Sequence, residues 1–156
     1  MGSMSTLKDQ LRTDLTSAMK ARDKERAGTL RMVMASITEA EVAGKEAKEL
    51  TDDEIITILT REAKKRREAA TAFADGGRAE QAEKETAEAA VITEYLPAQL
   101  SAEEISDLVS KAIAQTGAAD EGMRAMGKVM GILTPQTKGR ADGGAVAAEV
   151  RNQLAS

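Results

Sequence analysis

The side chains through which this chain could do chemistry are carboxylates, lysines, arginines and hydroxyls, because the sequence contains neither histidine nor cysteine. Their absence removes the commonest general acid and base near neutral pH, thiolate nucleophiles and the usual zinc ligands. The glycine-bearing motifs of serine hydrolases, P-loop enzymes and dinucleotide-binding enzymes are missing as well. We therefore expect no catalysis by this chain alone, and no metal or other cofactor.

The most unusual charge pattern lies between residues 123 and 140, where the chain carries several cations and no acidic residue. The cations are Arg124, Lys128, Lys138 and Arg140. The net charge of the whole chain is -4, so a polyanion would be attracted to this patch rather than to the protein in general. The chain has one phenylalanine, one tyrosine and no tryptophan, too few rings to stack bases. Any nucleic acid would be held by its backbone or its shape.

Glycines accompany these cations. On an α-helical wheel, Gly127 and Gly131 share a face with Arg124 and Lys128, opposite an apolar arc. The arc consists of Met126, Val129, Met130 and Leu133. A glycine inside a helix costs about 1 kcal/mol relative to alanine, so two of them call for a reason. Either they let another helix of the same bundle approach closely, or they flatten the face so that a phosphate backbone can approach the cations.

The second half of the patch is a loop. Lys138 and Arg140 flank Gly139 just ahead of a predicted helix whose cap is Asp142 or Gly143. The backbone N–H groups and the dipole at a helix N-terminus favour an anion, and two cations beside them add to that attraction. The alternative is an ordinary solvated turn, and the sequence leaves both interpretations open.

A separate basic run, REAKKRRE, occupies residues 61–68. Within it, Glu62 and Arg66 have the favourable i,i+4 orientation, and Lys64 and Glu68 have the weaker reverse orientation. The run is typical of a salt-bridged solvent face. Its excess positive charge could also extend an electrostatic surface begun by the patch at residues 123–140.

The elements that must position these residues are all predicted to be helices, because alanine, leucine, glutamate and lysine dominate and only two prolines interrupt. The predicted spans are 5–21, 24–43, 51–75, 79–96, 101–116, 121–134 and 142–154. Capping boxes at Thr51 and Ser101 open two of them. Gly44 and Asp120 are candidate caps, the first ending the second helix and the second opening the sixth. The expected fold class is all-α, without a sheet.

The segment LPAQL at residues 96–100 divides this series of helices. We expect a helical N-terminal domain over residues 4–96 and a small three-helix tail domain over residues 98–156. Residues 1–3 are typical of an expression remnant. No stretch approaches the roughly 18 consecutive apolar residues of a membrane span, and no charged-then-apolar leader opens the chain. We therefore expect a cytoplasmic protein without a membrane partner.

Several segments resemble the GatB/YqeY family, specifically its stand-alone YqeY-type members. The segments are LRMVMASITEAE at residues 30–41, REAKKRRE at 61–68, EYLPAQLS at 94–101, MGKVMG at 126–131 and KGRADGGAV at 138–146. The resemblance covers essentially the whole chain after Met4, and the two tail motifs carry most of it. It implies a helical N-terminal part followed by the helical tail of the B subunit of glutamine-dependent tRNA amidotransferases.

In that enzyme the tail contacts tRNA and chemistry occurs on other domains. The resemblance therefore implies a tRNA-recognising set in this chain, with Arg124 added from the charge pattern. The implied set is Lys128, Lys138 and Arg140, supported by Gly127, Gly131 and Gly139. Stand-alone members lack the catalytic cradle and magnesium site of the full subunit. The implied partners are tRNA and an amidotransferase or aminoacyl-tRNA synthetase.

Three functions are consistent with this pattern. The first is a non-catalytic tRNA-binding or tRNA-chaperoning module. The second is a protein-interaction adaptor whose glycine-bearing helix face docks another helix. The third is carbon–nitrogen ligase activity with glutamine as amide donor, which rests on family inheritance only.

Overall fold

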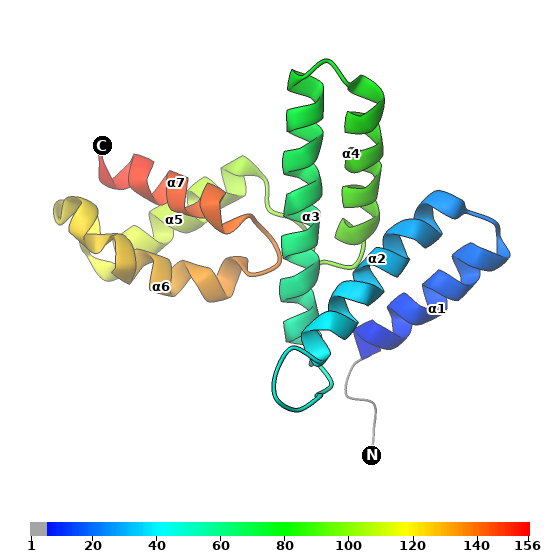
Figure 1. Ribbon diagram of the computed structural model, residues 1–156. Helices are drawn as coiled ribbons and strands as arrows, with labels where there is room; N and C mark the ends of the chain where they lie inside the picture. Colours follow the sequence, from blue (N-terminus) through cyan, green and yellow to red (C-terminus); the bar gives the residue numbers. More distant parts are fainter. Residues whose placement is uncertain (1–5) are drawn as a thin grey trace. The chain divides into compact units, whose positions relative to one another are not determined.

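The computed structural model describes residues 6–156, which form seven α-helices and two short 3-10 helices and contain no β-strand (Figure 1). The α-helices are α1 (Thr6–Lys20), α2 (Lys24–Glu41), α3 (Asp52–Asp75), α4 (Ala79–Thr93), α5 (Ala102–Thr116), α6 (Met126–Thr137) and α7 (Gly143–Leu154). The 3-10 helices η1 (Ala118–Asp120) and η2 (Gly122–Ala125) precede α6. The all-α prediction is confirmed; Ser5, where the first helix was expected to begin, lies outside the described residues.

The chain divides into two compact units, Met1–Leu96 and Pro97–Ser156. Each unit has its own apolar core. The first core is formed by Leu11, Leu30, Val33, Ile37, Leu50, Ile55, Ile58, Leu59, Ala63 and Ile92. The second is formed by Val109, Ala112, Ile113, Ala118, Ala125, Val129, Leu133, Val146, Val150 and Leu154. Because the two cores share no residue, each unit positions its own surface residues.

The first unit consists of two helical hairpins, α1–α2 and α3–α4, with α3 and α4 lying antiparallel along their length (Figure 1). Polar contacts tie the end of α4 to the first hairpin. The Tyr95 hydroxyl donates to the Asp14 carboxylate of α1, and the Arg26 guanidinium of α2 pairs with Glu94. Burial, followed by the Asp14 carboxylate, raises the pKa of Tyr95 to about 12. These contacts fix the first hairpin against the second.

The predicted boundaries of α3 are confirmed, and those of α2 and α4 are partly wrong. Thr51 forms the expected capping box with Glu54, and α3 ends at Asp75 before Gly76. Helix α2 ends at Glu41, two residues early, and Gly44 is not in the left-handed region. Helix α4 ends at Thr93 rather than at residue 96, because residues 94–96, just before the proline, form hydrogen-bonded turns instead of a further helical turn.

Helix α1 ends in a left-handed turn at Arg22, whose φ is 60°. The Arg22 amide donates to the Met19 carbonyl and the Asp23 amide to the Ala18 carbonyl, which is the hydrogen-bond pattern of a Schellman motif. Glycine is the usual residue at this position, because a side chain there costs about 1 kcal/mol or more. The sequence thus places an arginine where the backbone would favour glycine.

The second unit is a bundle of α5, α6 and α7. Ser101 forms the predicted capping box with Glu104 and opens α5, which ends at a left-handed Gly117. Asp142 caps α7, as predicted, by accepting a hydrogen bond from the Gly144 amide. The three helices bury one stripe each against the second core, which leaves the opposite faces to solvent.

The predicted limits of the sixth helix are wrong at both ends. Asp120 belongs to η1 and makes no side-chain cap, and α6 begins only at Met126, after the η2 turn. At the other end α6 continues through Pro135 to Thr137. Pro135 lacks the N–H that would bond to the carbonyl of Gly131, and its ring crowds that carbonyl. The Thr137 hydroxyl donates a hydrogen bond to the Leu133 carbonyl in the last turn.

Candidate nucleic-acid interface

Helix α6 separates its apolar and glycine-bearing residues between two faces. Val129 and Leu133 are fully buried in the core, and Met126 and Met130 pack against it. On the other side Gly127, Lys128 and Gly131 are exposed. We call these three residues, together with Arg124 before α6 and Lys138 after it, the basic α6 face.

The two glycines of the basic α6 face meet no other part of the second unit. A Cβ atom built on Gly127 or Gly131 would find no heavy atom within 4 Å, apart from the immediate helix backbone. A glycine that allowed two helices of the bundle to approach closely would meet its neighbour within that distance. The interpretation that these glycines serve packing inside the bundle is therefore wrong.

The cations of the basic α6 face differ in their freedom. The Lys128 ammonium lies 2.9 Å from the Glu121 carboxylate, with the two side chains 48% and 38% exposed. Such an exposed ion pair is worth about 0–1 kcal/mol and is easily exchanged for another anion. Arg124 and Lys138 are exposed, and no ion pair or side-chain hydrogen bond engages either within residues 6–156. Since Arg124 lies in η2, the α-helical wheel does not fix its direction relative to Gly127.

Gly139 and Arg140 take part in the structure of the unit. Gly139 is buried and left-handed, with a φ of 74°. Its carbonyl accepts a hydrogen bond from the Gln99 side chain, and the Arg140 carbonyl accepts one from the Leu100 amide. The Arg140 guanidinium donates to the Ala98 carbonyl at 3.3 Å. Sequence reasoning treated residues 96–100 as a linker and missed this anchor, because nothing in a local pattern pairs positions some 40 residues apart.

The start of α7 does not present a free anion site. The Asp142 carboxylate occupies the first turn by accepting from the Gly144 amide, so a negative charge already neutralises the helix N-terminus. Near Arg140, the Ser101 backbone amide lowers the pKa of Glu104, and the charge of Arg140 lowers it further by a smaller amount. Lys138 is therefore the cation of this loop that is best placed to meet an external phosphate.

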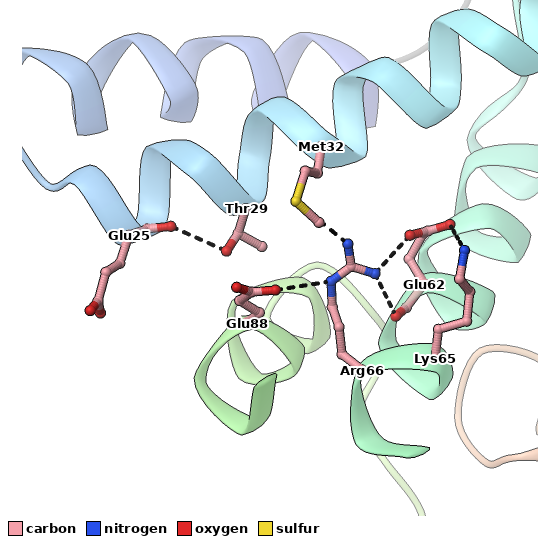
Figure 2. Close-up of polar contacts among 7 residues, drawn as sticks. All are labelled: Glu25, Thr29, Met32, Glu62, Lys65, Arg66 and Glu88. Carbon is pink, nitrogen blue, oxygen red and sulfur yellow. Dashed lines mark hydrogen bonds and ion pairs between the residues drawn. The ribbon is translucent and has the colours of Figure 1, made fainter. Parts of the chain in front are cut away.

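The basic run at residues 61–68 is not a simple solvent face. Arg66 and Glu62 form the predicted pair at 2.7 Å, but their side chains are only 8% and 9% exposed. As Figure 2 shows, the Arg66 guanidinium is enclosed by Glu62, Glu88 of α4 and the sulfur of Met32. The prediction of an exposed ion pair is thus wrong, because α2 and α4 cover this side of α3.

The carboxylates around Arg66 respond to its charge and to their burial. For Glu62, burial raises the pKa, but the hydrogen bond from Arg66 and the charges of Lys65 and Arg66 outweigh it and lower the pKa. For Glu88, burial and the neighbouring Glu85 raise the pKa. The Arg66 Nε lies 3.4 Å from Glu88 without a well-formed hydrogen bond. Arg66 thus joins α2, α3 and α4 of the first unit through Met32, Glu62 and Glu88, and we call this cluster the buried pin.

The described part of the chain contains neither a candidate metal centre nor a membrane-spanning helix. Residues 6–156 bring together no group of three or more carboxylates that could hold a metal ion. None of their helices is long and apolar enough to cross a membrane.

Comparison with known proteins identifies the family of this chain. A family model described as YqeY-like protein matches residues 8–154. A protein of Pyrenophora tritici-repentis, named altered inheritance of mitochondria protein 41, mitochondrial, is 31% identical over 136 residues, covering 85% of this chain and 71% of that protein. An uncharacterized protein of Schizosaccharomyces pombe is 33% identical over 92 residues, covering 58% of this chain and 72% of that protein.

Proposed function

The chain belongs to the YqeY-like family, and from this premise we propose that it is a non-catalytic tRNA-binding accessory protein. The RNA backbone lies on the basic α6 face, and the tail acts as it does in the related amidotransferase subunit. Partner enzymes are an amidotransferase or an aminoacyl-tRNA synthetase. The proposal places the chain in the cytoplasm, although the name of the Pyrenophora tritici-repentis relative places that protein in mitochondria.

The observation that carries the proposal is the open space over Gly127 and Gly131 beside exposed cations. Absent side chains let a rigid backbone approach closely, and Arg124 and Lys138 are free to meet its phosphates. From Arg124 to Lys138 the face extends about 20 Å, taking 1.5 Å per helical residue. That length suits several successive phosphates of a folded RNA.

The expected binding is dominated by counterion release. Three cations that each neutralise one phosphate give a slope of about -2 to -3 in log affinity against log salt concentration. Raising salt from about 50 to about 200 mM should then weaken binding by about 20- to 40-fold. The measurement is fluorescence anisotropy of labelled bulk tRNA with the full chain.

A matched pair of variants tests whether the basic α6 face is responsible. The test variant is Arg124→Gln with Lys138→Gln, and the control is Arg151→Gln with Lys111→Gln. Each pair removes one arginine and one lysine that are exposed in the same unit. The test variant should bind tRNA at least about tenfold more weakly, and its salt slope should be shallower by about 1.4 to 1.8. The control should keep the affinity and the salt slope of the wild type. Equal losses in the two variants would refute the assignment of this face.

The protein-interaction adaptor remains a second candidate, because open space over two glycines also admits a partner helix, and Met123 in the preceding η2 turn is 49% exposed. An adaptor of this kind would bind its partner with a shallow salt dependence and would ignore tRNA. The inherited ligase activity is a third candidate. Turnover in a glutamine-dependent amidation assay of the purified chain would establish it.

A further inference from the structure

The first unit carries a second surface, a hollow where α1 ends and α2 begins. It has a volume of about 470 Å³. We call it the α1–α2 hollow, and it is lined by Ala18, Met19, Arg22, Asp23, Lys24, Ala27 and Arg31. None of these residues belongs to the basic α6 face, and the inference below does not depend on tRNA binding.

The floor of the α1–α2 hollow is apolar and partly uncovered. Ala18 and Ala27 are nearly buried, whereas Met19 is 51% exposed. Methionine is flexible and polarizable, and it is over-represented on surfaces that adapt to bound peptides. An exposed methionine and two small side chains in the same hollow leave room for one large apolar side chain from a partner.

The rim of the hollow is positively charged. Arg22, Lys24 and Arg31 stand against a single acid, Asp23, whose carboxylate already accepts a hydrogen bond from the Arg26 amide. The three cations are exposed, and in the described chain their side chains have no ion pair or hydrogen bond. The hollow thus combines an apolar floor with unpaired positive charge.

Two neighbouring hollows of the first unit lack this combination. The hollow between α2 and α4 is lined by equal numbers of cations and acids. Its charged residues are Asp23, Lys24, Glu25, Arg26, Lys84 and Glu88. The hollow between α2 and α3 is lined by three cations, Arg61, Lys65 and Arg66, and by two acids, Glu39 and Glu62. Arg66 and Lys65 both pair with Glu62, so the excess of positive charge there is one cation. The α1–α2 hollow, with three cations against one acid, therefore has the largest excess of positive charge of the three.

The backbone also directs an arginine into this site. Arg22 lines the hollow from the left-handed position of the Schellman motif. Its side chain therefore lies at the rim because of a turn that glycine would form more easily.

We propose that the α1–α2 hollow binds a partner protein through a short acidic segment, in which one large apolar side chain is flanked by aspartates or glutamates. The apolar side chain packs on Met19, and the carboxylates pair with Lys24 and Arg31. An RNA ligand fits less well, because a phosphate backbone gains nothing from an apolar floor and the hollow has no aromatic ring on which a base could stack.

The test is selection of peptides from a phage-displayed library of random 12-residue sequences on the full-length protein. Selected peptides should share an apolar residue between acids. Their affinity should fall at least tenfold in the double variant Lys24→Glu with Arg31→Glu. It should stay within twofold in the matched control Lys111→Glu with Arg151→Glu. Met19→Gln, which changes no charge, should weaken binding severalfold.

Circular dichroism and the fluorescence of Tyr95 establish that each variant is folded. A selection without an acidic–apolar consensus, or peptides that bind Lys24→Glu with Arg31→Glu as tightly as the wild type, would overturn the proposal. Displacement of the peptides by bulk tRNA in the variant Arg124→Gln with Lys138→Gln would overturn it as well, because the hollow would then be an RNA surface. Failure of tRNA to bind anywhere would leave this proposal standing and would reject only the proposed function.

Discussion

Removal of the Arg66 side chain should destabilise the first unit far more than removal of its neighbour Arg67. In Arg66→Met the carboxylates of Glu62 and Glu88, 9% and 17% exposed in the wild type, lose the cation that they enclose. Breaking a buried ion pair by deleting one partner costs about 3–5 kcal/mol. Arg67→Met is the matched control, because Arg67 is exposed and surface substitutions stay within about 0.5 kcal/mol.

The pH dependence of the loss follows from the carboxylates. In the wild type the pKa of Glu62 is lowered, so its contribution to stability is present above its ordinary pKa of 4.5 and is lost as the pH falls through the lowered value. In Arg66→Met the hydrogen bond and the charge of Arg66 are lost, so burial, opposed only by Lys65, raises the pKa of Glu62 above its wild-type value. Folding then favours the protonated form, and stability is gained as the pH falls. The difference in free energy of unfolding between the variant and the wild type should be largest near pH 7 and should become smaller toward about pH 4.5.

The assay uses a reporter that belongs to one unit. Tyr95 is the single tyrosine of a chain without tryptophan, and it lies in the first unit against Asp14. Urea unfolding followed by its fluorescence therefore reports the first unit alone. Adding Glu62→Gln to Arg66→Met should restore part of the stability. Equal losses in Arg66→Met and Arg67→Met, or a loss independent of pH, would refute the account of the buried pin.

Three further predictions concern other contacts. Replacing Gly127 and Gly131 together by alanine should stabilise the second unit by about 2 kcal/mol, because each substitution gains about 1 kcal/mol and the added Cβ atoms meet nothing. The same variant should bind tRNA more weakly. Urea unfolding followed by circular dichroism measures the first effect, and the anisotropy assay measures the second. Thr51→Ala and Ser101→Ala should each cost about 1 kcal/mol through a lost cap, but only the first should move the tyrosine-detected transition. Ultraviolet titration of Tyr95 should have a midpoint near 12. Since that pKa is raised, the tyrosine's contribution to stability is present below about pH 10 and is lost as the pH rises through 12.

Local sequence determined the helices and most of their caps. The boxes at Thr51 and Ser101 and the cap at Asp142 depend on side chains within three residues of the helix start, so the chain specifies them without help from distant contacts. Other predicted boundaries were wrong where a local signal competed with packing in the core. Proline usually ends a helix, but α6 continues through Pro135, because the last turn buries Leu133 and Thr137 in the second unit.

Tertiary structure decided which charged residues of the sequence motifs are exposed and which are buried or hydrogen-bonded. The sequence could place Arg66 opposite Glu62, but only the packing of α2 and α4 over α3 buries the pair. It could flank Gly139 with two cations, but only the bonds from residues 98–100 make Arg140 part of the fold. Periodicity is a property of one helix, whereas burial and hydrogen bonding depend on what other segments bring to it. The surfaces left uncovered, on α6 and in the α1–α2 hollow, are therefore features that only the folded chain defines.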